Sequence, residues 1–119
     1  MADYVEVIKG DKSIQVCFYI TDSKIMEIGE KMNSIQQEAY MNGYNWEAFF
    51  NYYLKNNAPD VLEEMDSDPE ANMYVAFYPL TSSNEAHAEK FAKIVQSLVE
   101  NETELYRIVK ENGNEIAWD

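Results

Sequence analysis

The chain has 119 residues, of which 46% are apolar, and a formal net charge of −13. This length permits one domain with a sizeable core, and the apolar content excludes a disordered chain despite the charge. The charge disfavours nucleic acid and anionic membrane surfaces as partners, because it repels phosphate groups, and it favours basic proteins or cations. Solubility alone is the alternative explanation of so acidic a composition.

The N-terminal residues predict a β-hairpin. Apolar residues recur at every second position over residues 14–20, and a shorter apolar run occupies residues 5–8. Gly10 and Asp11, which lie between the runs, are residue types that take the positive φ of tight hairpin loops. Cys17 is the only cysteine, so an intrachain disulfide is excluded, and we expect it to be a small buried hydrophobe in the second strand.

One helix is expected directly after the hairpin. Asp22 or Ser23 can accept a hydrogen bond from the free amides of its first turn, and apolar residues then recur at helical spacing as far as Ala39. We expect Asn42-Gly43 to end this helix, because glycine is the usual residue at the left-handed position after a helix C-terminus.

An aromatic stripe predicts a second helix. Asn45 is placed to cap it, and residues 56–58 end it before Pro59, which can open a short helical turn through Leu62. The stripe is expected to pack in the core between helix and sheet. Its members are Trp46, Phe49, Phe50, Tyr53 and Leu54.

The C-terminal half predicts one more strand and two more helices. Residues 71–79 alternate as a strand does, and residues 85–99 carry apolar positions at helical spacing. Asn101 is placed to cap the last helix, with Glu104 three residues later as in a capping box. Residues 116–118 are expected to form either a short edge strand or a packed tail.

The order of these elements predicts one α+β domain over residues 1–119. Its sheet is expected to be small and mainly antiparallel, made of the N-terminal hairpin and the later strand, with about four helices packed on one face. No apolar stretch approaches the roughly 20 residues of a membrane span. The N-terminus also lacks the basic start and apolar core of a signal peptide. We therefore expect a cytoplasmic protein without membrane contact.

Residues 60–70, called the acidic segment below, carry six carboxylates and no cationic side chain. Crowded carboxylates repel one another, so a folded domain tolerates them as a solvated face or as a surface for a cation-rich partner. The run from Asp66 to Glu70 resembles the start of a calcium loop. However, Ala71 and Phe77 stand where that loop needs a glycine and a bidentate glutamate, so we expect no calcium loop here.

The sequence carries no recognisable catalytic or cofactor motif. Cys17 and His87 are the only residues of their types, too few for the usual zinc sites, and His87 is expected at the surface or as a capping residue. The glycines match neither a P-loop nor a dinucleotide fingerprint, and no Gly-x-Ser-x-Gly elbow occurs. We expect a binding protein without metal or cofactor; a small hydrolase that uses carboxylates is the weaker alternative.

Two blocks of sequence carry a resemblance to a known family. The first is Gly43-Tyr44-Asn45-Trp46-Glu47-Ala48-Phe49-Phe50, and the second is Asp68-Pro69-Glu70-Ala71-Asn72-Met73-Tyr74. At this spacing they resemble a family of small bacterial immunity proteins from polymorphic and contact-dependent toxin systems, over about residues 43–78. Asn72 departs from the glycine expected there, although asparagine is the next most tolerant residue for a left-handed backbone.

The resemblance implies a non-catalytic cytoplasmic inhibitor that binds one cognate toxin domain and blocks its active site or an exosite. Many such toxins act on nucleic acid and carry basic clefts, which an anionic surface can occupy. We therefore predict partner contacts from carboxylates of the acidic segment and from aromatic anchors. The predicted contact residues are Glu63, Glu64, Asp66, Asp68 and Glu70, with Tyr44 or Trp118 as the anchor.

Two alternatives stay open at this point. In the first, Asp68 and Glu70 have a structural role and close the loop before the third strand by accepting backbone amides. In the second, the chain is an acidic adaptor or regulatory module that is unrelated to toxins. Sequence alone also does not decide whether the acidic segment or the outer face of the sheet meets a partner.

Overall fold

The predicted hairpin forms one half of a four-stranded antiparallel sheet. In the computed structural model, which describes residues 3–119, strands β1 (Val5–Lys9) and β2 (Ser13–Phe18) pair, and β4 (Tyr74–Pro79) pairs with β2 on its other side. A two-residue strand, β3 (Asp66–Ser67), completes the order β1-β2-β4-β3. The sequence did not predict β3, because two residues are too few to show an alternation.

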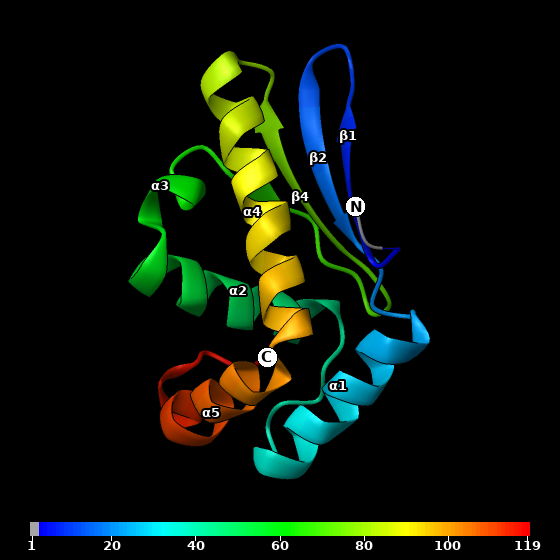
Figure 1. Cartoon of the computed structure of the whole chain (residues 1–119), viewed down its shortest axis with the longest axis vertical. Coiled ribbons are helices and arrows are strands. Elements are labelled where there is room, and N and C mark those ends of the chain that lie inside the picture. The colour runs from blue at the N-terminus through cyan, green and yellow to red at the C-terminus, as the bar shows by residue number, and fades with distance from the viewer. Residues whose placement is uncertain (1–2) are drawn as a thin grey trace.

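The α+β class is confirmed, and the helices are arranged unevenly around the sheet. Helix α4 lies along one face and contacts β1, β2 and β4, while α1 packs against α5 beyond one end of the strands (Figure 1). The prediction that about four helices share one face is therefore too simple. The helical elements are α1 (Ser23–Ile35), α2 (Gly43–Asn57), α3 (Pro59–Leu62), α4 (Ser82–Glu100), α5 (Glu102–Asn112) and the 3-10 helix η1 (Gly113–Glu115).

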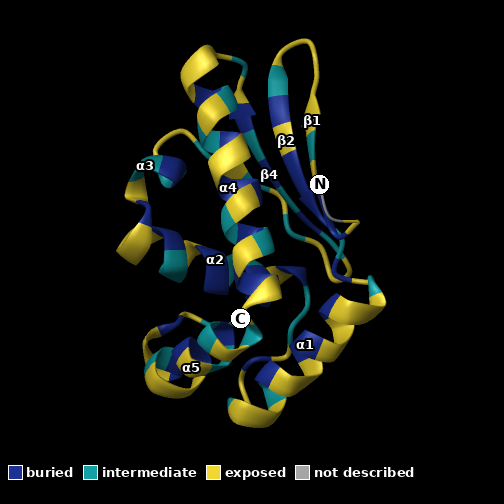
Figure 2. Cartoon of the chain, viewed as in Figure 1, coloured by how far each residue is buried: buried dark blue, intermediate teal, exposed yellow. Residues whose placement is uncertain are grey.

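The core lies between α4, α2 and the inner face of the sheet. Alternate strand residues are buried on this face, where Val5, Phe18 and Tyr74 form one row across β1, β2 and β4. The aromatic stripe of α2 packs against this row, with the rings of Phe18 and Trp46 edge to face at 4.9 Å between centroids. Buried and exposed residues accordingly alternate along the helices, as expected of helices that pack one face on the core (Figure 2). The predicted core role of the stripe is confirmed for its fully buried members, Trp46, Phe49, Phe50 and Leu54.

Several predicted caps differ from the structure. Asp22 does cap α1, since its carboxylate accepts from the Lys24 amide at 3.0 Å, but the helix ends at Ile35 and not near Ala39 because Gln36 is extended. Asn101 occupies the cap position of α5 without a capping side-chain hydrogen bond. Glycine conformations differ too. The described glycines all have φ below zero, so the positive φ expected at the hairpin loop is absent.

The start of α2 is displaced from its predicted place. Asn42, and not Asn45, accepts from the helix amides, with its side-chain oxygen 3.0 Å from the Asn45 nitrogen. Asn45 is instead buried, and its amide group donates to the Tyr40 carbonyl at 2.8 Å and accepts from the backbone of Asp119 at 2.6 Å. One buried side chain thereby ties the connection before α2 to the C-terminal tail, which packs as a tail and not as an edge strand.

Buried tyrosines predict a loss of stability in alkali. Burial raises the pKa values of Tyr74 and Tyr78 well above their usual range, and a hydrogen bond donated to Glu6 raises the pKa of Tyr19 to about 12. Because these folded-state pKa values exceed the unfolded value, the stabilisation is complete below about pH 10 and is lost as the pH rises through the folded values. Urea unfolding should therefore show a steep fall in stability above about pH 10.

Tyrosine absorbance at 295 nm during the same titration reports which groups ionise. Tyr78→Phe should flatten the alkaline fall, because the Tyr78 hydroxyl is buried and donates to the Val61 carbonyl at 2.9 Å. An alkaline slope in this variant equal to that of the wild type would contradict the assignment.

Candidate partner-binding surface

The five predicted carboxylates all project from the fold into solvent. They follow α3 through a turn, β3 and the loop into β4, and Glu63, Glu64, Asp66, Asp68 and Glu70 are all exposed. The backbone beneath them is held by the sheet: the Asp68 amide donates to the Val75 carbonyl and the Glu70 amide to the Met73 carbonyl, both at 2.8 Å. The charges are therefore presented on a fixed backbone.

Asp60, the first carboxylate of the acidic segment, has a different role. Lys90 of α4 donates to its carboxylate at 3.0 Å, and this hydrogen bond lowers the pKa of Asp60. His87 lies 4.0 Å from the same carboxylate and contacts the side-chain oxygen of buried Asn84. Asp60 thus joins α3 to α4. No sequence signal pointed to this, since the cation lies thirty positions away.

The structural role proposed for Asp68 and Glu70 is not the one observed. Among residues 3–119, no backbone amide donates to either carboxylate; the loop is closed by the backbone amides of these residues. Glu64 does have a partner, because the Asn84 side chain lies 3.4 Å from its carboxylate. The other four predicted carboxylates form no hydrogen bond or ion pair in the part of the chain that the structure describes. They belong to Glu63, Asp66, Asp68 and Glu70.

The two blocks that carry the family resemblance meet in space. The Gly43 amide lies 3.3 Å from the Ala71 carbonyl, and the Ser67 hydroxyl donates to Glu47. A Cβ atom on Gly43 would come within 1.9 Å of the Glu70 carbonyl oxygen, so only glycine fits at this close approach. The start of α2 and the loop before β4 are therefore one unit.

Asn72 needs no left-handed backbone in this unit. The structure describes no non-glycine residue with positive φ, so Asn72 does not adopt the left-handed conformation that was expected there. The close approach that demands a glycine lies instead in the first block, at Gly43.

The two predicted aromatic anchors line one groove. A groove of about 410 Å³ between α2 and the C-terminal tail includes Tyr44 and Trp118, together with Glu47 and Tyr52. Tyr44 is 43% exposed. Trp118 is half-buried, and its indole nitrogen donates to the Gly113 carbonyl at 2.9 Å. Of the two predicted anchors, Tyr44 is thus the more exposed, while Trp118 also holds the C-terminal tail in place.

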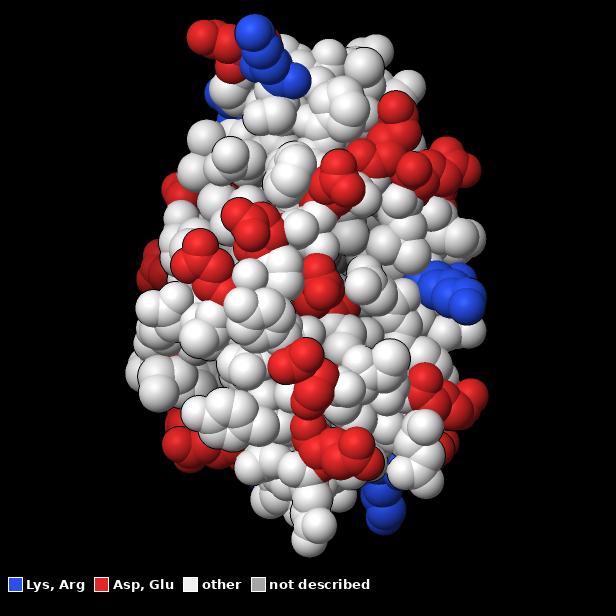
Figure 3. Space-filling view, turned by 180° about the vertical axis from the view of Figure 1, so that it is seen from behind, with Lys and Arg blue, Asp and Glu red and all other residues white. Residues whose placement is uncertain are grey.

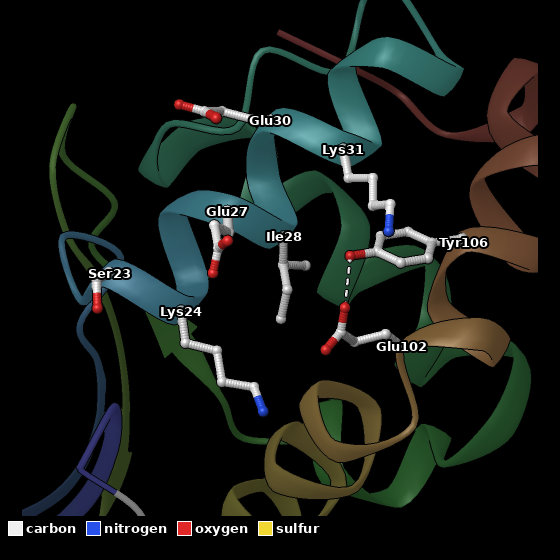
Figure 4. A pocket seen from close by; sticks show the side chains of 8 residues that line it. All are labelled: Ser23, Lys24, Glu27, Ile28, Glu30, Lys31, Glu102 and Tyr106. Atoms are coloured by element: carbon white, nitrogen blue, oxygen red, sulfur yellow. Dashed lines mark hydrogen bonds between the residues drawn. The ribbon is translucent and has the colours of Figure 1, made fainter.

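A larger hollow of about 700 Å³ lies between α1 and α5 (Figure 4). Lys31 of α1 reaches over the ring of Tyr106, 5.3 Å from its centroid, and the Tyr106 hydroxyl donates to Glu102 at 2.9 Å. No sequence pattern singled out these residues. Two lysines and three glutamates line this hollow, so neither charge sign dominates its lining.

Other kinds of site find little support in the described residues. Over residues 3–119, no three His, Cys, Asp or Glu side chains are grouped as metal ligands. Cys17 is buried as predicted, and burial raises the pKa of its thiol. No helix in this part of the chain combines the length and apolarity that a bilayer crossing needs.

The comparison with known proteins gives one match. No curated protein and no solved structure matches the chain. The family model described as immunity protein 51 matches residues 5–114, which include the whole sheet and all five α-helices. The family suggested by the two sequence blocks over about residues 43–78 is therefore confirmed over almost the full length. This chain belongs to the immunity protein 51 family.

Proposed function

We propose that this protein binds one cognate toxin domain and neutralises it by covering the toxin's active site or an exosite. The observation that carries the proposal is the family match over residues 5–114. The exposed carboxylates on a fixed backbone support a binding surface, since a rigid surface loses little conformational entropy when a partner docks. In this proposal the protein acts in the cytoplasm of the producing cell.

The charge of the molecule supports a basic partner, with a nuclease among the candidates. A net charge of −13 accelerates association with a cationic domain, because it attracts that domain over a distance of about the Debye length. Nucleic-acid-cleaving domains carry basic clefts that hold phosphate, and carboxylates occupy such clefts well. The expected interaction therefore weakens as salt rises.

Co-expression with the toxin domain of a neighbouring gene tests the proposal. Cells that make this protein should survive toxin induction, and cells that lack it should stop growing. In vitro, toxin activity should fall linearly with added protein and reach its minimum near one equivalent, because a non-catalytic inhibitor acts by occupying its target. Protection at a small fraction of one equivalent would indicate an enzyme. Absence of both binding and protection would favour the acidic adaptor.

A further inference from the structure

The outer face of the sheet is open. Helix α4 covers the inner face. The molecule seen from behind carries acidic side chains scattered from end to end among uncharged ones, with a few basic ones at the margins (Figure 3). The strand register shows which residues occupy this outer face, since side chains alternate between the two faces of a sheet.

Two rows of side chains cross the outer face from edge to edge. The first row runs from Asp66 through Phe77 and Gln15 to Ile8, and so joins β3, β4, β2 and β1. Its ends differ in character, because Asp66 is an exposed carboxylate and Ile8 is an apolar side chain that is 42% exposed. Phe77 lies between them and is half-buried. Apolar Phe77 and Ile8 thus stand on either side of the exposed amide of Gln15, and the row ends in an acid at β3.

The second row has its acid at the opposite edge. It runs from Val75 through Cys17 to Glu6. Asp68 of the acidic segment lies next to this row, because its backbone amide donates to the Val75 carbonyl. The Glu6 carboxylate accepts from the Tyr19 hydroxyl at 2.6 Å, so its position at the β1 edge is held. Apolar side chains therefore occur in both rows, and carboxylates stand at both edges of the face.

Cations are missing from these rows. None of the nine lysines and arginines occupies an outer-face register position in the strands. Lys9 belongs to the inner-face series, opposite Ile14, and forms an ion pair with Glu85 of α4. The outer face thus has apolar side chains between two edge carboxylates, Asp66 at β3 and Glu6 at β1, which form an acidic rim. This composition suits a protein partner of opposite charge.

We infer that the toxin domain docks on this outer face, with its apolar side chains against Ile8, Val75 and Phe77 and its basic side chains against the acidic rim. The inference rests on the proposed function. It joins the two surfaces that the sequence left as alternatives, because Asp66 belongs both to the acidic segment and to the first row.

The small area of the sheet face also favours an interface that includes the acidic segment. Four strands of up to six residues cover at most about 15 Å by 18 Å at the usual strand spacing and rise, or about 300 Å², and β3 has only two residues. A specific interface buries about 800 Å² on each partner. The sheet face alone is too small, so the acidic segment and Tyr19 at its margins are needed to complete the interface.

Truncation of apolar side chains on the outer face tests the inference, with the toxin domain of the neighbouring gene as the probe. The double variant Ile8→Ala, Phe77→Ala should weaken binding by about 30-fold or more, the effect of losing a central contact. Ile8→Ala alone, at an exposed position that does not threaten the fold, should weaken it by about 5-fold. The control Met26→Ala, Tyr40→Ala removes one aliphatic and one aromatic side chain that are exposed outside the sheet, and it should bind as the wild type does.

Titration calorimetry measures the affinities, and circular dichroism checks the fold of each variant. Loss of binding in the control with no loss in the sheet variants would overturn the docking face and leave the proposed function intact. Equal binding by all variants would also overturn it. If the wild type neither binds the toxin domain nor protects cells, the proposed function fails, and the docking inference fails with it.

Discussion

Replacing Asp66, Asp68 and Glu70 together by lysine should lower the affinity for a basic toxin domain about 100-fold at low salt and leave the fold intact. Each exposed charge pair at an interface contributes up to about 1 kcal/mol, and every 1.4 kcal/mol is a tenfold change in affinity. The domain should fold because its backbone, and not these side chains, closes the loop before β4. Most of the loss is expected in the association rate, where steering by charge acts.

A second triple variant separates local contact from net charge. Glu30, Glu89 and Glu100 are exposed residues of α1 and α4, and their replacement by lysine changes the net charge by the same amount. This control should lose no more than about 5-fold in affinity at about 0.15 M salt, since charges beyond a Debye length of about 8 Å are then largely screened. Affinities measured at two salt concentrations complete the test. Similar losses in the two variants would mean that the acidic segment is only part of a general negative field.

Gly43→Ala should destabilise the fold by about 3 kcal/mol, near the upper end of the cost of overpacking. Helix propensity alone predicts the opposite sign, because alanine is favoured over glycine inside a helix by up to about 1 kcal/mol. The new Cβ atom would lie 1.9 Å from the Glu70 carbonyl oxygen and 2.3 Å from that of Met73. Both are backbone atoms, so either α2 or the loop before β4 has to move.

Thermal unfolding measures this effect, with an expected fall in Tm of about 10 °C for a domain of this size. Gly10→Ala is the matched control, because a Cβ atom there meets only the Ser13 carbonyl, at 3.4 Å, and no positive φ is involved. It should change stability by less than about 0.5 kcal/mol. A Gly43 variant as stable as this control would show that the contact between the two sequence blocks is not a tight one.

Elements governed by local rules could be predicted from the sequence. The hairpin followed from alternation at every second residue, and the aromatic stripe of α2 followed from helical spacing, because burial of one face imposes these periods wherever the element sits. Asp22 was predicted as a cap for the same reason: its carboxylate accepts from an amide two residues away. The family resemblance was likewise carried by short blocks, although the match extends over residues 5–114.

Elements that depend on distant partners could not be predicted in this way. Asn42 and Asn45 have the same side chain, so either could cap α2. Asn42 is the cap because Asn45 is buried and hydrogen-bonded to the C-terminal tail. In the sequence the carboxylates of the acidic segment look equivalent. In the structure Asp60 differs from the others, because it forms an ion pair with Lys90 of α4.

The sequence by itself therefore determined the α+β class, the core stripe and the excess of negative charge, since each depends on composition or on short spacing. The tertiary structure decided where that charge stands. Strand register brings Asp66 beside Phe77 and sets Glu6 at the opposite edge. The register of β2 and β4 depends on pairing between segments some sixty residues apart, and no local pattern encodes that pairing.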